Sequence, residues 1–304
     1  MAIPTFQVVM RPLLELASDG RELRTSEAVG VLGDQFHLTK EEREELLPSG
    51  RQRRFNNRIA WATAYFRATG LLVSPGRGRY TITERGRQAI ASGQQIDLKY
   101  LSQFPELAAF RTGTGAHGET DKQLPTEVST ATPDEILEST SQALRKQLAV
   151  DLLEKVHGVD PAFFEKLVVD LLIEMGYGGS RKEAGKAIGQ SGDEGIDGII
   201  NEDKLGLDVV YIQAKRWATG NTVGRREVQM FTGSLEGKQA SKGVFITTSA
   251  FTGEARDYVK KISKRIVLID GEELAQLMID HGVGVADVNH YVTKRIDSDY
   301  FEVE

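Results

Sequence analysis

Apolar and polar residues recur with a helical period over much of the first 95 residues. This spacing predicts helices over 6–17, 25–36, 41–47 and 55–69, and Gly70 ends the last of these. Two short strands follow, joined by a Pro-Gly-Arg-Gly turn at 75–78, and a further helix begins at Glu84. Helices that end in a β-hairpin predict a winged-helix domain, a variant of the helix-turn-helix.

From Asp160 onward the pattern changes, because helical and strand periods alternate along the chain. Asp160-Pro161 predicts the start of a helix that Gly176 ends. After it come, in order, strands at 196–200 and 209–215 joined as a hairpin, a helix at 226–240, an apolar strand at 243–249, a helix at 253–264, and a strand at 265–271 with a helix behind it. This alternation predicts an α/β fold with a mixed, mostly parallel sheet flanked by helices.

The segment between these two regions has no such period. Residues 111–132 are rich in Thr, Gly and small polar side chains, a composition that cannot bury enough surface to fold. Pro133 then stands at the first position of a long amphipathic helix, which we expect either to pack on the second domain or to join two subunits. We therefore predict a winged-helix domain over 1–95, a linker over 96–132 and a second domain over 133–304.

Composition narrows the possible functions. The 304 residues include no cysteine, which excludes disulfides, thiolate catalysis and Cys-ligated zinc, and the five histidines have no metal-binding spacing. Nothing at the N-terminus resembles a signal peptide and no apolar run approaches the length of a membrane span, so we expect a cytoplasmic protein without membrane contact.

Charge is distributed unevenly. Residues 1–95 carry 14 Lys and Arg against 10 Asp and Glu, although the whole chain has a net charge of −6. Nine arginines and a single acid, Glu84, lie within 51–87, which indicates a local anion-binding surface or, less specifically, a solvated helix face.

In a winged helix that binds DNA, the helix 55–69 would enter the major groove. Asn56, Asn57 and Arg58 near its start would then meet base edges, and Arg77 and Arg79 on the hairpin would meet backbone phosphates. Winged helices also mediate contacts between proteins, so the sequence leaves that alternative open.

Three polar residues interrupt the strands of the second region. Asp197 stands at the mouth of the strand 196–200 between Gly195 and Gly198, while Gln213 and Lys215 share one face of the strand 209–215. A core strand has no need of an amide and a lysine side by side. Their combination with a nearby carboxylate is typical of a metal-dependent nuclease, in which a divalent ion neutralises phosphate oxygens and activates water.

Mg²⁺ prefers oxygen ligands, which this pattern supplies. We expect the Asp197 carboxylate, the Gln213 amide oxygen and the backbone carbonyl of Ala214 to bind the ion, and Lys215 to orient the attacking water and offset charge in the transition state. Because Gln213 is neutral, a second carboxylate is expected, and Glu165 on the helix that begins at 161 is the candidate. Asp193 is an alternative ligand or only a turn-former, and Gln229 could approach the site.

The segments GDEGIDG (192–198), YIQAKRW (211–217) and GVFITTSAFT (243–252) together resemble the Mrr-type restriction endonucleases, a branch of the PD-(D/E)XK nuclease superfamily. The winged-helix-like start and DYFEVE (299–304) extend the resemblance over nearly the whole chain. It implies a restriction-endonuclease-like αβββαβ core, a Mg²⁺ requirement and cleavage of DNA with methylated bases. Ile196 replaces the superfamily's proline and Gln213 its acid, which leaves the number of metal ions open.

These observations predict a Mg²⁺-dependent endonuclease of the methylation-dependent, type IV restriction class. Each active site would cut one strand, so double-strand cleavage implies a homodimer or a larger homo-oligomer. Two alternatives remain: a winged-helix regulator whose nuclease-like domain only binds DNA, and a nuclease specific for branched DNA.

Overall fold

The computed structural model describes residues 2–76, 78–112, 130–178, 195–203, 206–218 and 220–294. The chain forms two compact units, residues 1–143 and 144–304, and each is described by itself. Arg77, Asp193 and the closing segment 299–304 lie outside the described residues. In the part of the chain that the structure describes, no helix is both long and apolar enough to cross a membrane.

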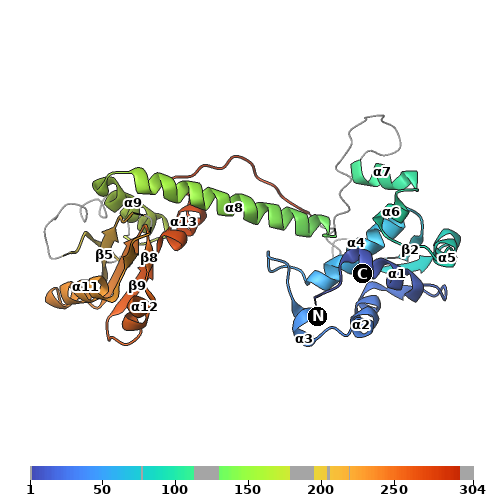
Figure 1. Cartoon of the computed structure of the whole chain (residues 1–304), viewed down its shortest axis with the longest axis horizontal. Helices are drawn as coiled ribbons and strands as arrows, with labels where there is room; N and C mark the ends of the chain where they lie inside the picture. Colours follow the sequence, from blue (N-terminus) through green and yellow to red (C-terminus); the bar gives the residue numbers. More distant parts are fainter. Residues whose placement is uncertain are drawn as a thin grey trace. The chain divides into compact units, whose positions relative to one another are not determined.

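The first unit combines helices with a small antiparallel sheet (Figure 1). Its sheet has the order β1-β3-β2, in which β3 pairs antiparallel with both neighbours. The elements are α1 (Phe6–Leu16), β1 (Leu23–Arg24), α2 (Thr25–Gln35), α3 (Lys40–Glu44), α4 (Arg54–Ala68), β2 (Leu72–Gly76), β3 (Arg79–Ile82), α5 (Glu84–Ala91), α6 (Leu98–Leu101) and α7 (Pro105–Thr112).

Local sequence explains where several of these helices begin. Thr39 forms a capping box with Glu42 at the start of α3, and the Thr83 side chain accepts from Gly86 N at the start of α5. The predicted hairpin after α4 is confirmed as β2 and β3. Strand β1, only two residues long, was not predicted, because it has too few residues to show an alternating pattern.

The core of the first unit extends further along the chain than the sequence pattern suggested. Leu98, Leu101 and Leu107, on α6 and α7, are buried in the same cluster as the side chains of α1 and α4. Residues 98–112 are therefore part of this unit, and the linker that we predicted from residue 96 begins later. Helices of four and eight residues carry too little periodic signal to be distinguished from a linker.

The second unit is a four-stranded mixed sheet with helices on both faces. Its elements are α8 (Pro133–Gly158, of which residues 144–158 lie in this unit), α9 (Pro161–Glu174), β4 (Gly198–Asn201), β5 (Val209–Lys215), β6 (Thr222–Val223), α11 (Arg225–Gly237), β7 (Lys242–Thr247), β8 (Ala250–Phe251), α12 (Gly253–Val259), β9 (Arg265–Ile269) and α13 (Gly271–Asp280). The main sheet has the order β4-β5-β7-β9, and β6 and β8 form a separate pair.

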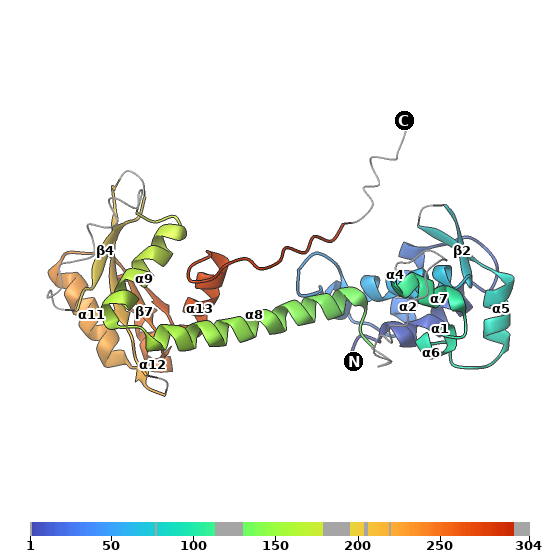
Figure 2. The ribbon, with the colours of Figure 1, turned by 90° about the horizontal axis from the view of Figure 1, so that it is seen from above.

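Strand register confirms the predicted mixed sheet. β4 runs antiparallel to β5, with Gly198 opposite Ile212, whereas β5, β7 and β9 are parallel. One hydrophobic cluster joins this sheet to α8, α9 and α13, and a second joins it to α11 and α12, so the sheet is covered on both faces (Figures 1 and 2). Of the three consecutive strands expected in an αβββαβ core, the described residues include β4 and β5.

Candidate active site

Asp197 is held at the start of β4 by the neighbouring strand. Its backbone N–H donates to Ile212 O over 2.8 Å, and its Oδ2 accepts from Ala214 N over 2.7 Å. The pairing of β4 with β5 ends at Gly198 and Ile212. Beyond that pair, the Asp197 carboxylate accepts the Ala214 N–H that a backbone carbonyl of β4 would otherwise accept. Strand register therefore places Asp197 against the backbone between Gln213 and Lys215.

Gln213 carries a buried polar atom without a partner. Its side chain is 5% exposed, and among the described residues none donates a hydrogen bond to Oε1. Buried acceptors are almost always satisfied, and leaving one unpaired costs about 1–3 kcal/mol. An amide oxygen in this state, beside a carboxylate, is fitted to a cation.

Gly195 makes room for the Gln213 amide. Its φ is +88°, and a Cβ at this position would lie 3.1 Å from Gln213 Nε2 and 4.0 Å from Ser234 Oγ on α11. A side chain here would therefore be strained and would press on the amide. Gly195 therefore keeps the space beside the Gln213 amide open.

Lys215 lies at the end of β5, where β7 fixes the backbone. The Lys215 carbonyl accepts from Thr247 Oγ1 over 2.8 Å and from Thr248 N over 3.3 Å. Thr248 Oγ1 also accepts from Trp217 N over 2.9 Å and donates to Trp217 O over 2.8 Å. Both threonines are fully buried or nearly so, and they hold the strand end that carries the lysine.

Glu165 approaches the same place from α9. That helix starts at Asp160, whose side chain accepts from Phe163 N over 2.9 Å, and Glu165 is half-buried on its second turn. Burial raises the pKa of the Glu165 carboxyl above its usual range, and the negative charge of Asp197 raises it further. The Glu165 and Asp197 carboxyl groups are therefore close enough to interact electrostatically.

The donor set fits a hard cation. Asp197, Glu165 and the Gln213 amide supply oxygen atoms, and Mg²⁺ binds through one or two carboxylates. The N–H and C=O of one strand residue point to the same edge, so the Ala214 carbonyl faces the edge where its N–H meets Asp197. Within the described ranges, no three His, Cys, Asp or Glu side chains gather at one point.

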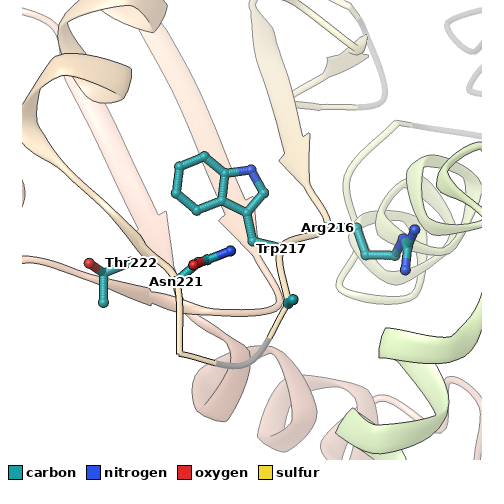
Figure 3. A pocket seen from close by; sticks show the side chains of 5 residues that line it. Arg216, Trp217, Asn221 and Thr222 are labelled. Carbon is teal, nitrogen blue, oxygen red and sulfur yellow. The ribbon is translucent and has the colours of Figure 1, made fainter.

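A pocket of about 500 Å³ follows directly after Lys215 along the chain (Figure 3). It is lined by Arg216, Trp217, Ala218, Asn221 and Thr222. The Trp217 ring lies toward Asn221 and Thr222, whereas Arg216 points the other way, where its Nη1 donates to His157 O over 2.7 Å. Gln229 is exposed on α11 and makes no contact that would bring it to the site.

In the first unit, the residues expected to contact DNA are differently placed. Asn57 is only 1% exposed, and Arg58 is ion-paired with Glu135 over 2.7 Å. Asn56 is half-buried near the start of α4, and exposed Arg79 pairs with Glu22 over 3.1 Å. Asn57 and Arg58 therefore present no free donor to a base edge in this conformation, because residues of the same chain occupy them.

Local sequence does not single out the two threonines, because nothing in it links Thr247 to a lysine 32 residues earlier. A usable signal was present in the pairing of parallel strands. If GVFITT is set beside YIQAK, Thr247 falls opposite Lys215.

Comparisons with known proteins show which family the chain belongs to. A family model described as a restriction endonuclease matches residues 156–278, and one described as the Mrr N-terminal domain matches residues 6–92. The chain is 37% identical over 310 residues to the type IV methyl-directed restriction enzyme EcoKMrr of Escherichia coli (strain K12), covering 99% of this chain and all of that protein.

Two solved structures show weaker similarity. The MspJI restriction endonuclease in complex with a 27-mer oligonucleotide superposes with a TM-score of 0.28 at 22% identity, covering 57% of this chain and 39% of that one. The DNA modification-dependent restriction endonuclease AspBHI gives 0.35 at 18% identity, covering 70% and 56%. This chain thus spans less than two thirds of either structure, and the superpositions are too loose to support a structural argument. The full-length identity and the two matched domains establish that the chain belongs to the Mrr family of restriction endonucleases.

Proposed function

We propose that this restriction endonuclease requires Mg²⁺ and hydrolyses phosphodiester bonds in double-stranded DNA that carries methylated bases. The observation that carries the metal requirement is the buried, unpartnered Gln213 Oε1 beside the Asp197 carboxylate. The methylated substrate is inferred from the relative of E. coli, which is named as methyl-directed.

Bound at this site, Mg²⁺ would neutralise phosphate oxygens and make water a stronger nucleophile. Asp197, Gln213, the Ala214 carbonyl and Glu165 would hold it. The Lys215 ammonium would orient the attacking water and offset the negative charge that develops on the phosphate. Thr247 and Thr248 keep the lysine's backbone in place, and the pocket at Trp217 gives the flanking DNA strand room beside it.

For the whole chain we propose a winged-helix reader over residues 1–95, whose core α6 and α7 extend, then a connecting segment, and a catalytic domain that the sequence places at 133–304 and whose compact unit begins at residue 144. The reader would bind DNA through α4 and through the β2–β3 hairpin with Arg77 and Arg79. One active site cuts one strand, so we propose a homodimer or larger homo-oligomer acting on both strands. We place its action in the cytoplasm, where incoming DNA is met.

The test uses matched plasmids with and without methylated bases, incubated with the full-length protein in Mg²⁺ or in EDTA. We expect wild type to cut only the methylated plasmid and only in Mg²⁺, and Asp197→Ala to cut neither. Cleavage in EDTA would contradict the metal requirement, and equal cleavage of both plasmids would contradict the proposed substrate. Asp151→Asn, which changes an exposed acid on α8, is the control for the loss of one charge.

A further inference from the structure

The surface of α4 that the sequence assigns to DNA is covered by the beginning of α8. We call residues 132–138, which start that helix, the acidic turn. Asp134 Oδ2 accepts from Asn57 Nδ2 over 2.6 Å and from Trp61 Nε1 over 3.1 Å. Glu135 Oε1 accepts from Arg58 Nε over 3.0 Å and from Arg58 Nη2 over 2.7 Å.

Further contacts fix the acidic turn in place. Thr132 is fully buried, and its Oγ1 donates to Asn57 Oδ1 over 2.6 Å. Its backbone N–H donates to Glu135 Oε2 over 2.8 Å while its Oγ1 accepts from Glu135 N over 3.2 Å, the reciprocal pattern of a capping box. At the far end, Glu138 Oε2 accepts from Ser49 N over 2.9 Å.

The donors on this surface are those that bind the DNA backbone. Arginine guanidinium, asparagine amide and backbone N–H groups make most protein contacts to phosphate. Here they meet three carboxylates, which like phosphate are anions with several acceptor oxygens. The Arg58 and Glu135 side chains are only 12% and 10% exposed, so their pair is shielded from water and no phosphate reaches Arg58 while it lasts.

Resting on the proposed role of α4 in DNA binding, we propose that the acidic turn is an internal competitor for the DNA backbone. DNA binds this surface only after Asp134 and Glu135 leave α4 and Glu138 leaves Ser49, which precedes that helix. Because the competitor belongs to the same chain, it acts at a high effective concentration. The apparent affinity for DNA is then lowered by the small fraction of molecules in which the surface is free.

The test compares two full-length double variants with the same change in charge. Asp134→Asn/Glu135→Gln weakens the covering contacts, whereas Asp151→Asn/Glu154→Gln neutralises two exposed acids further along α8. Binding to a methylated duplex is measured in EDTA, so that cleavage does not intervene. We expect the first variant to bind at least about 5-fold more tightly than the second, the lower end of typical coupling between sites.

Equal affinity of the two double variants would overturn the proposal, because it would show that only net charge matters. Adding Arg58→Ala to Asp134→Asn/Glu135→Gln should abolish the gain, and an undiminished gain would also overturn it. If that double variant does not fold, Glu138→Gln, which weakens the contact to Ser49 by removing its charge, should still bind more tightly than Asp151→Asn. A tighter-binding variant that never cuts in Mg²⁺ would contradict the proposed nuclease chemistry and leave this inference standing.

Discussion

The two units differ in whether the polar groups of their candidate functional residues already have partners within the chain. In the second unit, the Asp197 carboxylate accepts from Ala214 N, next to Gln213 along the strand. The Gln213 Oε1 atom is buried and has no hydrogen-bond partner among the described residues. At α4 of the first unit, Asn57 and Arg58 already bind carboxylates of their own chain. In the second unit strand pairing positions the candidate residues, whereas in the first unit the donors of Asn57 and Arg58 are occupied by residues of the same chain.

The difference has a physical origin in how each surface is built. Strand pairing fixes the backbone of Asp197 and of Lys215 through hydrogen bonds to the neighbouring strands. The face of α4 instead depends on side-chain contacts with a segment 75–77 residues later, and such contacts are exchangeable for similar ones. A preformed catalytic site with a covered reader would keep an enzyme that damages DNA inactive until its substrate arrives.

The largest effect should come from Lys215→Ala. Loss of one preorganised donor to the transition state is expected to slow Mg²⁺-dependent cleavage by about 10²-fold or more and leave DNA affinity nearly unchanged. The matched control is Lys242→Ala on β7, whose ammonium pairs with Glu202 and Asp208. The measurement is the single-turnover cleavage rate of Lys215→Ala compared with that of Lys242→Ala. A rate equal to that of the control would show that Lys215 takes no part in the mechanism. The contrast between the two units would then lose its main support.

A smaller effect, of about 10-fold in Mg²⁺ affinity, is expected for Gly195→Ala, because the new Cβ presses on the Gln213 amide. Gly176→Ala is a close control, since Gly176 also has a positive φ, of 102°, but no atom within 4 Å of the added carbon. Both variants should lose similar stability, and only the first should need more Mg²⁺ for half-maximal cleavage. Equal Mg²⁺ requirements would show that the Gln213 amide does not bind the ion.

The smallest effect concerns the pH dependence of stability. The raised pKa of Glu165 favours its protonated form in the folded chain, so this contribution to stability is present below the ordinary glutamate pKa of about 4.3 and is lost as pH rises through the raised value. Glu165→Gln should therefore raise the melting temperature at pH 7 and give no gain at acidic pH.

Mg²⁺ should reverse the effect of Glu165→Gln on the melting temperature at pH 7, because a bound cation favours the ionised carboxylates. At pH 7 the ion should raise the melting temperature of wild type more than that of Glu165→Gln. Glu154→Gln, at an exposed position on α8, should behave as wild type in both measurements. If Mg²⁺ stabilises Glu165→Gln as much as wild type, Glu165 does not take part in the metal site.

Much of the second unit could be predicted from local pattern. Val209–Lys215 is a strand over the same residues that the sequence indicated, and the apolar run around Phe245 is the central parallel strand. The predicted boundaries were less accurate. The strand predicted from residue 196 starts at Gly198, and the helix predicted to end at 264 ends at Val259. The Ser and Lys residues at 260–264 are compatible with a helix or with a turn, so only packing chooses between them.

The sequence alone determined that Gln213 and Lys215 share one face of a strand and that Asp197 stands at the mouth of its neighbour, because side chains alternate along a strand and register follows from the apolar pattern. Only the tertiary structure decided that Asn57 and Arg58 meet Asp134 and Glu135. Helical spacing relates residues three or four positions apart, and no local rule pairs residues separated by 77. Whether a polar side chain is free or occupied is therefore settled by packing between distant segments.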